Sequence, residues 1–168
     1  MGRILKAIID KIPFQAIEKI EEDKRSRSFV LAGVEEAPSN LQASQRQKHL
    51  KDKVFGILDA LDIECRPTEI RRMGRPDPNR TRLIKVVFPS KHEWSTALSR
   101  AHLLRSAGFG EVYIRRSMRD VERKREYELR QLARERNRQV GSKEWVVYKW
   151  ELKRTAELNP HPKSGNSH

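Results

Sequence analysis

The amino-acid sequence predicts an α+β fold whose elements follow the order β-α-β-β-α-β, the split-βαβ sandwich. Four short runs rich in β-branched and aromatic residues predict strands. Two intervening segments repeat their apolar residues every three or four positions, which predicts helices, and turn-forming residues separate the elements. With right-handed crossovers, this order gives a four-stranded antiparallel sheet with both helices on one face. An N-terminal amphipathic helix and a C-terminal basic helix plus short strand are predicted to flank it.

The N-terminal segment, residues 2–23, is predicted to form a helix with a single apolar stripe. Apolar residues lie four positions apart in it, at Ile4, Ile8, Ile12, Ala16 and Ile20. Pro13 predicts a kink or a restart of this helix. Two interpretations stay open: the stripe packs on the chain's own domain, or it is the stub of a coiled coil through which the isoleucines self-associate.

The first strand and the first crossover helix follow. Residues 27–34 (RSFVLAGV) form a short β-prone run that ends in a glycine turn. After a loop around Pro38, apolar residues recur at helical spacing, which predicts a helix from Ser44 to about Asp62. The opposite face of the resulting sheet is predicted to be open for binding.

The second and third strands are predicted on either side of a turn. Residues 66–75 contain a strand centred on Ile70, and several Gly, Pro and Asn residues then mark the turn. Residues 82–88 (RLIKVVF) carry the clearest strand pattern in the chain, and Pro89 ends it.

The second half of the domain and its extension complete the prediction. A helix is expected over residues 91–106 and a fourth strand over residues 111–115. Ser117 and Asp120 have the spacing of a capping box for a helix that runs from Met118 to about residue 139. The predicted organisation is an amphipathic helix or coiled-coil stub at 1–24, the sheet domain at 25–117, a basic helix with a strand or hairpin arm at 118–158, and a disordered tail at 159–168.

The positive charge of the chain is concentrated in its second half. The 168 residues carry 36 Lys and Arg against 23 Asp and Glu, a net charge of +13. Residues 1–70 hold 12 of each sign, whereas residues 71–138 hold 19 basic and 8 acidic side chains. A solvated surface would intersperse both signs, so this segregation indicates binding to a polyanion. An acidic membrane is the weaker interpretation, because the most basic helix has only a thin apolar stripe and no apolar run is long enough to span a bilayer.

Strand alternation predicts which side chains reach the open face of the sheet. If Ile84, Val86 and Phe88 point into the core, Lys85 points outward. The same argument turns Arg71, Tyr113 and Arg115 outward, so that one face offers cations for phosphates and a ring for one stacked base. The full set of predicted nucleic-acid contacts is Arg71, Arg72, Arg75, Arg80, Arg82, Lys85, Tyr113, Arg115, Arg116, Arg123, Lys124 and Arg130.

Each of these assignments has a plainer alternative. Tyr113 could be a partly buried surface aromatic. The charges of the helix beyond residue 118 could form i,i+4 ion pairs, such as Glu126 with Arg130, on a solvated surface.

Nothing in the sequence predicts catalysis. No metal-ligand spacing or glycine-rich phosphate loop occurs, so no catalytic residue, metal or cofactor is expected. The single cysteine, Cys65, is interpreted as structural. The first 23 residues are acidic enough to argue against a signal peptide, which predicts an intracellular protein, cytoplasmic, nuclear or both.

Several runs together resemble a known family. They are FVLAGVEE (29–36), EIRRMGRP (69–76), RLIKVVFPS (82–90) and VYIRRSMRDVERKREYELRQLARERN (112–137). In order and content they resemble the RRM-like domain of the RNA-binding protein encoded by the first open reading frame of LINE-type non-LTR retrotransposons, including invertebrate elements. The likeness covers about residues 25–155.

The resemblance implies a fold and a function. It implies an RRM-like βαββαβ domain that binds RNA, with contacts at the positions of Arg82, Lys85 and Arg115. It further implies trimerisation through an N-terminal coiled coil, of which this chain would hold a stub, and an abbreviated C-terminal domain. The sequence departs from ordinary RRM domains, which stack bases on aromatic residues of the first and third strands, because Val30 and Lys85 stand at such positions.

Three functional hypotheses therefore stay open. The first is a weakly sequence-specific, chaperone-like module for single-stranded RNA, or single-stranded DNA, derived from a retrotransposon. The second is a protein-interaction or oligomerisation domain with the same fold. The third is a fragment of a retrotransposon polyprotein.

Overall fold

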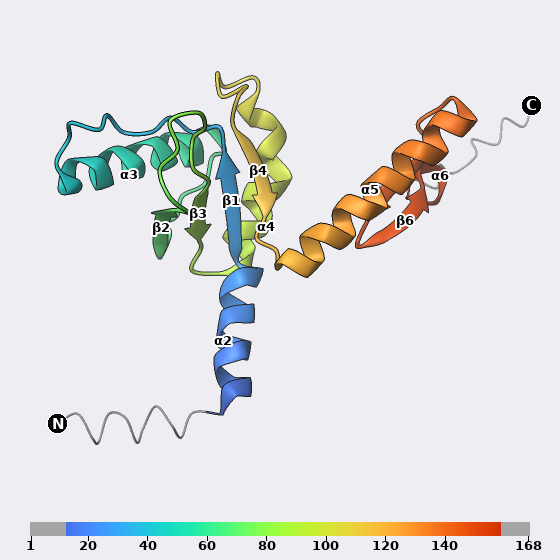
Figure 1. Ribbon diagram of the computed structural model, residues 1–168, viewed down its shortest axis with the longest axis horizontal. Helices are drawn as coiled ribbons and strands as arrows, with labels where there is room; N and C mark the ends of the chain where they lie inside the picture. The colour runs from blue at the N-terminus through green and yellow to red at the C-terminus, as the bar shows by residue number, and fades with distance from the viewer. Residues whose placement is uncertain (1–12, 159–168) are drawn as a thin grey trace, which may run out of the picture. The chain divides into compact units, whose positions relative to one another are not determined.

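The computed structural model describes residues 13–158 and confirms the α+β class (Figure 1). The chain divides into two compact units, Met1–Ser117 and Met118–His168. The first unit contains α2 (Phe14–Ser26), β1 (Ser28–Ala32), α3 (Ala43–Ala60), β2 (Glu69–Arg72), β3 (Ile84–Val87), α4 (Lys91–Arg100), the 3-10 turn η1 (Ala101–Leu104) and β4 (Tyr113–Arg116). The second unit contains α5 (Asp120–Val140), β5 (Trp145–Tyr148), β6 (Glu151–Arg154) and the short α6 (Thr155–Leu158).

The four strands of the first unit form one antiparallel sheet in the order β2-β3-β1-β4. The central strand β1 pairs with β3 on one side and with β4 on the other. Residues that pair directly across neighbouring strands point to the same face. The register therefore assigns every strand residue to one side of the sheet.

The hydrophobic core lies on the face that α3 and α4 cover. The sheet contributes Phe29, Leu31, Ile84, Val86 and Phe88, all of them fully buried. The helical side contributes Leu50, Val54, Ile57, Leu58, Ala97 and Leu104. Alternation along the third strand correctly predicted that Ile84, Val86 and Phe88 point inward, and Ile70 and Ile114 also pack against the core as expected.

A glycine at the end of β1 permits the close approach of the segment that leads into β4. Gly33 has a φ of +80°, and a Cβ atom placed there would lie 1.9 Å from the carbonyl oxygen of Glu111. Only a residue without a side chain adopts this backbone conformation at no cost and leaves room for that oxygen. The lack of a side chain at Gly33 therefore lets the end of β1 and the segment before β4 lie against each other.

The opposite face of the sheet is not fully open, which corrects the sequence-based expectation. Lys24, near the end of α2, reaches across to Glu69 of β2 in a 2.5 Å ion pair. Its carbonyl oxygen also accepts a hydrogen bond from the hydroxyl of Ser28. The row formed by Glu69, Val87 and Ser28 is therefore covered, and Val87 is fully buried although it lies outside the main core.

Helix α2 exposes large apolar residues instead of packing them on the sheet. Helix α2 begins at Phe14, directly after Pro13. Phe14 is 78% exposed and Ile20 is 64% exposed. The predicted stripe residues Ile4, Ile8 and Ile12 lie outside the described residues.

Two predicted helix boundaries were wrong. The capping box of α5 is formed by Arg119 and Glu122, whose carboxylate accepts a hydrogen bond from the Arg119 N–H at 2.6 Å, and not by Ser117 and Asp120. Helix α4 ends at Arg100 and continues as a 3-10 turn, although one continuous helix was expected. At α5, the side chain of Glu122 accepts from the backbone N–H of Arg119, the residue before the helix. A backbone N–H can be satisfied in this way whatever the side chain of its own residue.

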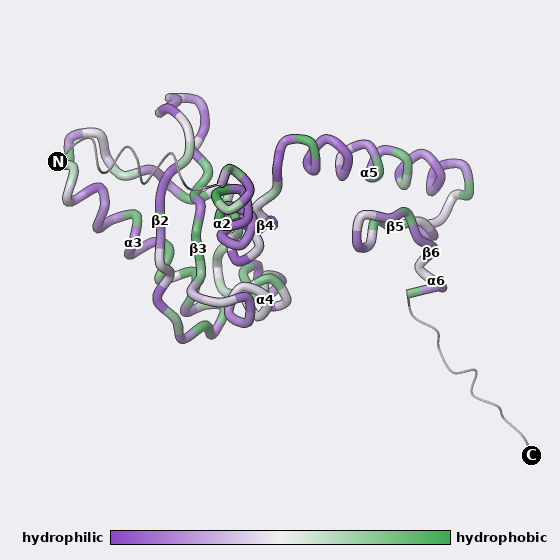
Figure 2. The backbone as a smooth tube through the Cα atoms, turned by 90° about the horizontal axis from the view of Figure 1, so that it is seen from below, coloured by the Kyte–Doolittle hydropathy of each residue, from purple (hydrophilic) through white to green (hydrophobic). Residues whose placement is uncertain are grey.

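The second unit is a helix on which a β-hairpin packs. The side-chain amide of Asn137 donates to the carbonyl of Trp145 at 2.8 Å and accepts from its N–H at 2.7 Å. The hairpin reverses at Lys149 and Trp150, both with positive φ, which is the geometry of a tight hairpin turn without its usual glycine. Most of α5 is polar around its circumference (Figure 2), and Val121 and Leu132 of the expected apolar stripe are exposed, whereas Ala133 is buried.

Candidate functional site

Three cationic side chains lie in one row across the exposed face of the sheet. Arg71 of β2 pairs with Lys85 of β3, Lys85 pairs with Val30 of β1, and Val30 pairs with Arg115 of β4. All four side chains therefore point to the same face, opposite the core. Neighbouring strands lie about 4.8 Å apart, so the row spans about 14 Å from β2 to β4. We call Arg71, Lys85 and Arg115 the cationic row.

Lys85 lies in an environment that disfavours its own charge. Burial lowers the pKa of its ammonium group most, and the positive charges of Arg71 and Lys24 lower it further. The carboxylates of Glu69 and Glu21 act in the opposite direction without cancelling these effects. A partly desolvated cation between other cations is stabilised when an anion binds.

The acid beside the row is already engaged. Glu69 accepts the ion pair from Lys24 and a 2.7 Å hydrogen bond from Nε of Arg71. These contacts hold the pKa of Glu69 below its usual range, with the hydrogen bond from Lys24 as the main cause. Glu69 therefore neutralises part of the charge at the β2 end of the row, while Arg115 lies at the other end.

The single aromatic side chain predicted for this face is well exposed. Tyr113 pairs with Ala32, two positions before Arg115 on β4, and therefore points to the same side. Its side chain is 61% exposed. The β1 residue between the cations is Val30, which is buried, so no aromatic ring is offered at this position.

Arg72 and Arg82, both predicted as nucleic-acid contacts, make hydrogen bonds and ion pairs within the fold. Arg72 lies on the core side of β2, with only 8% of its side chain exposed. Its guanidinium donates to the carbonyl oxygens of Val34 at 2.8 Å and Arg82 at 2.9 Å. Arg82 forms a two-pronged pair with Glu36, at 3.1 Å and 3.0 Å. Their guanidinium groups tie the loop after β1 to the β2–β3 segment.

The remaining predicted arginines of the first unit are scattered. Arg75 and Arg80 lie exposed in the turn between β2 and β3, and Arg80 pairs with Asp77 at 3.2 Å. Arg116 points to the helical side, where its guanidinium lies 5.7 Å from the centre of the Trp94 ring. None of these three belongs to the cationic row.

In the second unit, much of the charge of α5 is paired within the helix. Arg123 pairs with Asp120, and Arg130 pairs with Glu126, which confirms the predicted i,i+4 pair. Lys124, the third predicted contact of this helix, is exposed. Surface pairs of this kind contribute little to stability, about 0–1 kcal/mol each, but they lower the charge that the helix offers to an anion.

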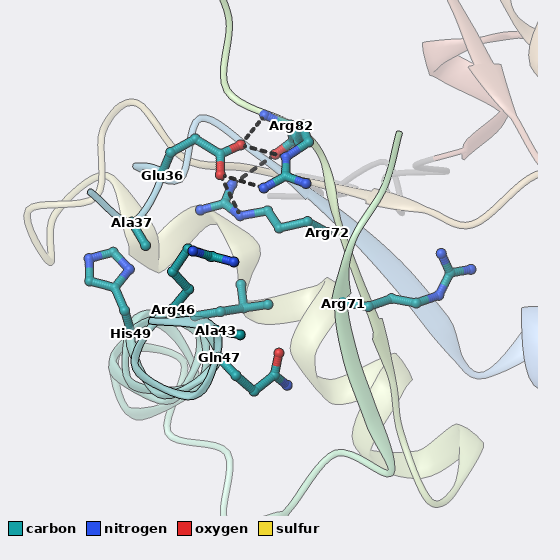
Figure 3. Close-up of a pocket in the computed structure, with 10 residues that line it drawn as sticks. Glu36, Ala37, Ala43, Arg46, Gln47, His49, Arg71, Arg72 and Arg82 are labelled. Atoms are coloured by element: carbon teal, nitrogen blue, oxygen red, sulfur yellow. Dashed lines mark hydrogen bonds and ion pairs between the residues drawn. The ribbon is translucent and has the colours of Figure 1, made fainter. Parts of the chain in front are cut away.

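One feature of the first unit has no counterpart in the sequence prediction. Arg46, Arg72 and Arg82 line a cavity of about 240 Å³ together with Glu36 and His49 (Figure 3). The apolar and polar residues of α3 that line it follow helical spacing, at Ala43, Arg46, Gln47 and Leu50. The sequence shows this helical spacing, but it does not predict that the loop after β1 folds over these residues and closes the cavity.

No group of three or more His, Cys, Asp or Glu side chains in residues 13–158 is placed to hold a metal ion. No helix in the same part of the chain is long and apolar enough to cross a bilayer.

Comparison with known proteins leaves the family open. No protein-family model matches this sequence, and no curated protein matches it either.

Proposed function

We propose that this protein binds single-stranded nucleic acid, RNA first of all, through the cationic row on the exposed face of its sheet. The observation that carries the proposal is the line of Arg71, Lys85 and Arg115 across three of the four strands. Lysine and arginine side chains bind backbone phosphates and release counterions, whatever the base sequence. The protein is in this view a binding module and not an enzyme.

The chemistry of the face supports weak sequence preference. Domains that read bases in this way stack them on aromatic rings of the central strands, where this chain has Val30 and Lys85. Tyr113 at the edge offers one ring, and a stacked base there would contribute about 1–3 kcal/mol. Affinity would therefore come mainly from phosphates and would fall steeply with salt.

We also propose that the first unit is an RRM-like domain. An RRM-like domain has a four-stranded sheet with the element order βαββαβ, and the strand order β2-β3-β1-β4 with both helices on one face supports this assignment. Derivation from the RNA-binding protein of a LINE-type retrotransposon rests on the likeness of the four sequence runs described above. An element-derived chaperone for its own RNA is the role that this origin suggests.

A binding titration tests the proposal. We would measure the fluorescence anisotropy of a labelled single-stranded RNA, a single-stranded DNA and a duplex with the full chain. The double variant Lys85→Glu/Arg115→Glu should bind the single strands at least about tenfold more weakly. The matched control is Lys48→Glu/Lys51→Glu, which makes the same change of net charge on the exposed side of α3 and should bind nearly as well as the wild type.

Comparing the two double variants distinguishes binding at the cationic row from a general effect of net charge. Equal weakening in both double variants would mean that only net charge matters and would remove the cationic row from the account. Absence of binding to all three probes at about 50 mM salt would contradict nucleic-acid binding itself.

Self-association is the second candidate function, and the exposed apolar side of α2 favours it. Phe14, Ile17 and Ile20 are all exposed on this helix. We propose that they continue the stripe of Ile4, Ile8 and Ile12 and pair with other copies of the chain. Sedimentation equilibrium of the wild type and of Ile17→Lys/Ile20→Lys tests this: a wild-type oligomer that the variant dissociates supports it, and a monomeric wild type contradicts it.

A further inference from the structure

The cavity between α3, β2 and the loop after β1 is a second cationic site, separate from the cationic row. Figure 3 shows the side chains of Arg46, Arg72 and Arg82 converging from three different segments of the chain. Arg71 also lines the cavity, but its side chain points away from it and donates to Glu69. Three guanidinium groups therefore meet in a space of about 240 Å³.

Only one carboxylate opposes these three charges. Glu36 lies against Arg82 in the two-pronged pair and 3.6 Å from Nε of Arg72. No other acidic residue lines the cavity. The side chains that line it therefore retain a net positive charge.

Part of the donor capacity of this cluster is unused. Arg82 uses Nε and Nη2 for Glu36, and Arg46 uses Nη1 for the carbonyl oxygen of Leu41 at 2.6 Å. Among the described residues, nothing accepts from Nη1 of Arg82 or from Nε and Nη2 of Arg46. The Nδ1 atom of His49 is buried and likewise has no hydrogen-bond partner in the described chain. The free guanidinium N–H groups, and the imidazole nitrogen when it carries a proton, can donate hydrogen bonds to an anion without breaking existing ones.

The electrostatic environment favours a negative charge in the cavity. Burial lowers the pKa of Arg72 most, and the charge of Arg82 lowers it further, while Glu36 acts against both. The first turn of α3, which lines the cavity through Ala43 and Arg46, adds the positive end of a helix dipole.

The size and chemistry of the cavity narrow the class of ligand. Its volume is below the roughly 300–1,000 Å³ of pockets that enclose a drug-sized ligand. The ring of His49 is the only one among its lining residues, so the cavity lacks a surface on which to stack a base. Forked guanidinium groups match the spacing of the oxygens of phosphate and carboxylate groups.

We infer that this cavity binds a phosphate group, through Arg46, Arg82 and the imidazole of His49. The phosphate could be inorganic, the terminal monoester of a nucleotide chain, or a bridging phosphodiester. This inference does not depend on binding at the cationic row, because the two sites use different side chains.

The test is a titration of the full chain with sodium phosphate, followed by backbone amide NMR shifts and compared with sodium chloride at equal ionic strength. Three variants make the same change of one charge unit on α3. Arg46→Gln removes a cavity cation, Gln47→Glu adds a carboxylate to the cavity, and Lys48→Gln removes a cation that does not line it.

Saturable phosphate-specific shifts at Ala43, Arg46 and Arg72 are expected in the wild type and in Lys48→Gln. Arg46→Gln and Gln47→Glu should bind phosphate about tenfold or more weakly, because each affects a charge-assisted hydrogen bond. Equal affinity in the three variants, or shifts that chloride reproduces, would overturn the inference.

Short oligonucleotides with a 5′-phosphate or a 5′-hydroxyl separate the sources of the phosphate. Binding at the cavity is judged by the amide shifts of Ala43 and Arg46. Tighter binding of the 5′-phosphorylated form there identifies a terminal monoester, and equal binding of both forms there, tighter than that of inorganic phosphate, identifies a phosphodiester. Failure of the inference is distinct from failure of the proposed function: Lys85→Gln should leave the phosphate titration unchanged, whereas Arg46→Gln should leave binding at the cationic row intact.

Discussion

Arg71 and Lys85 lie directly opposite each other across the β2–β3 ladder, on the exposed face of the sheet. Two like charges in this position destabilise a sheet. Burial is the main cause of the lowered pKa of Lys85, and repulsion by Arg71 lowers this pKa further. An uncharged side chain at position 85 would relieve the repulsion. The arrangement is therefore understood more easily as a site for an anion than as a device for stability.

Replacement of Lys85 should separate binding from folding. Lys85→Met keeps an unbranched apolar side chain of similar length and removes the penalised charge. Its free energy of unfolding should equal that of the wild type or exceed it slightly, within about 0.5 kcal/mol. Its affinity for single-stranded RNA should fall about tenfold. Urea denaturation and anisotropy measure the two quantities.

Lys85→Arg is the control for this experiment, because it keeps the charge and should keep most of the affinity. A Lys85→Met protein that loses more than about 1 kcal/mol of stability would show that the ammonium group supports the fold. That result would contradict our account of the row.

The affinity for RNA should depend on alkaline pH through the same residue. The pKa of Lys85 lies below its ordinary value of 10.5, so the free protein loses this proton earlier than an ordinary lysine does. Affinity should therefore fall as pH rises toward 10.5, and binding should take up protons there, because a bound phosphate raises the pKa again. Calorimetry in buffers of different ionisation enthalpy measures this uptake.

The effect on folding has the opposite sign. Between the lowered pKa and 10.5, the unfolded chain binds more protons at this position than the folded chain does, so the contribution of Lys85 to stability rises with pH. Lys85→Arg should abolish both dependences. Proton uptake that persists in Lys85→Arg would assign the effect to another group.

Gly33 should tolerate no side chain. In Gly33→Ala the new Cβ meets the carbonyl oxygen of Glu111, at a backbone conformation that alanine disfavours. We expect a loss of about 3 kcal/mol or more in the free energy of unfolding. Gly74→Ala is the matched control, since Gly74 has a φ of +81° but no atom within 4 Å of the added Cβ. It should cost about 1 kcal/mol, the price of the conformation alone. Similar losses in both variants would disprove the close approach at Gly33.

Glu36 should contribute to stability in a pH-dependent way. The hydrogen bond from the Arg82 side chain, aided by the charges of Arg72 and Arg82, holds the pKa of Glu36 below its ordinary value of 4.5. Its contribution is complete above pH 4.5 and is lost as pH falls through the lowered pKa. Glu36→Gln should lower the free energy of unfolding by about 1–2 kcal/mol at neutral pH.

The acid dependence distinguishes this effect from a general loss of packing. Thermal unfolding between neutral pH and pH values below 4.5 should show a smaller decline for Glu36→Gln than for the wild type. Parallel declines for the two proteins would mean that another carboxylate dominates acid unfolding.

Alternation and spacing sufficed to predict the sheet and the side on which its charges lie. The β3 pattern assigned Ile84 to the core and Lys85 outward, because successive side chains of a strand point to opposite faces. The register that aligns Arg71, Lys85 and Arg115 in one row is seen only in the pairing of the folded strands. The ion pair between Lys24 and Glu69 could not be predicted from periodicity. Periodicity shows which side of a helix a residue lies on, but not which strand its side chain contacts.

Contacts between distant segments lay beyond the sequence. Arg82 was predicted to bind nucleic acid because the family resemblance implies a contact at its position. Its partner Glu36 lies 46 residues earlier, and no local pattern links the two. The cavity was missed for the same reason: its α3 side follows helical spacing, but the loop that carries Glu36 and the edge strand that carries Arg72 close it only in the folded chain.

The salt dependence of binding tests the central claim most directly. For single strands the slope of log affinity against log salt is about −0.7 per phosphate contact. We would measure it by anisotropy for the wild type, for Arg71→Gln/Lys85→Gln/Arg115→Gln, and for a control with Lys48, Lys51 and Lys53 changed to Gln. Our account predicts that the slope of the first variant becomes shallower by about 2, one unit of 0.7 for each lost contact, while the control keeps the wild-type slope. A slope that is unchanged in the first variant, or equally reduced in both, would contradict binding at the cationic row.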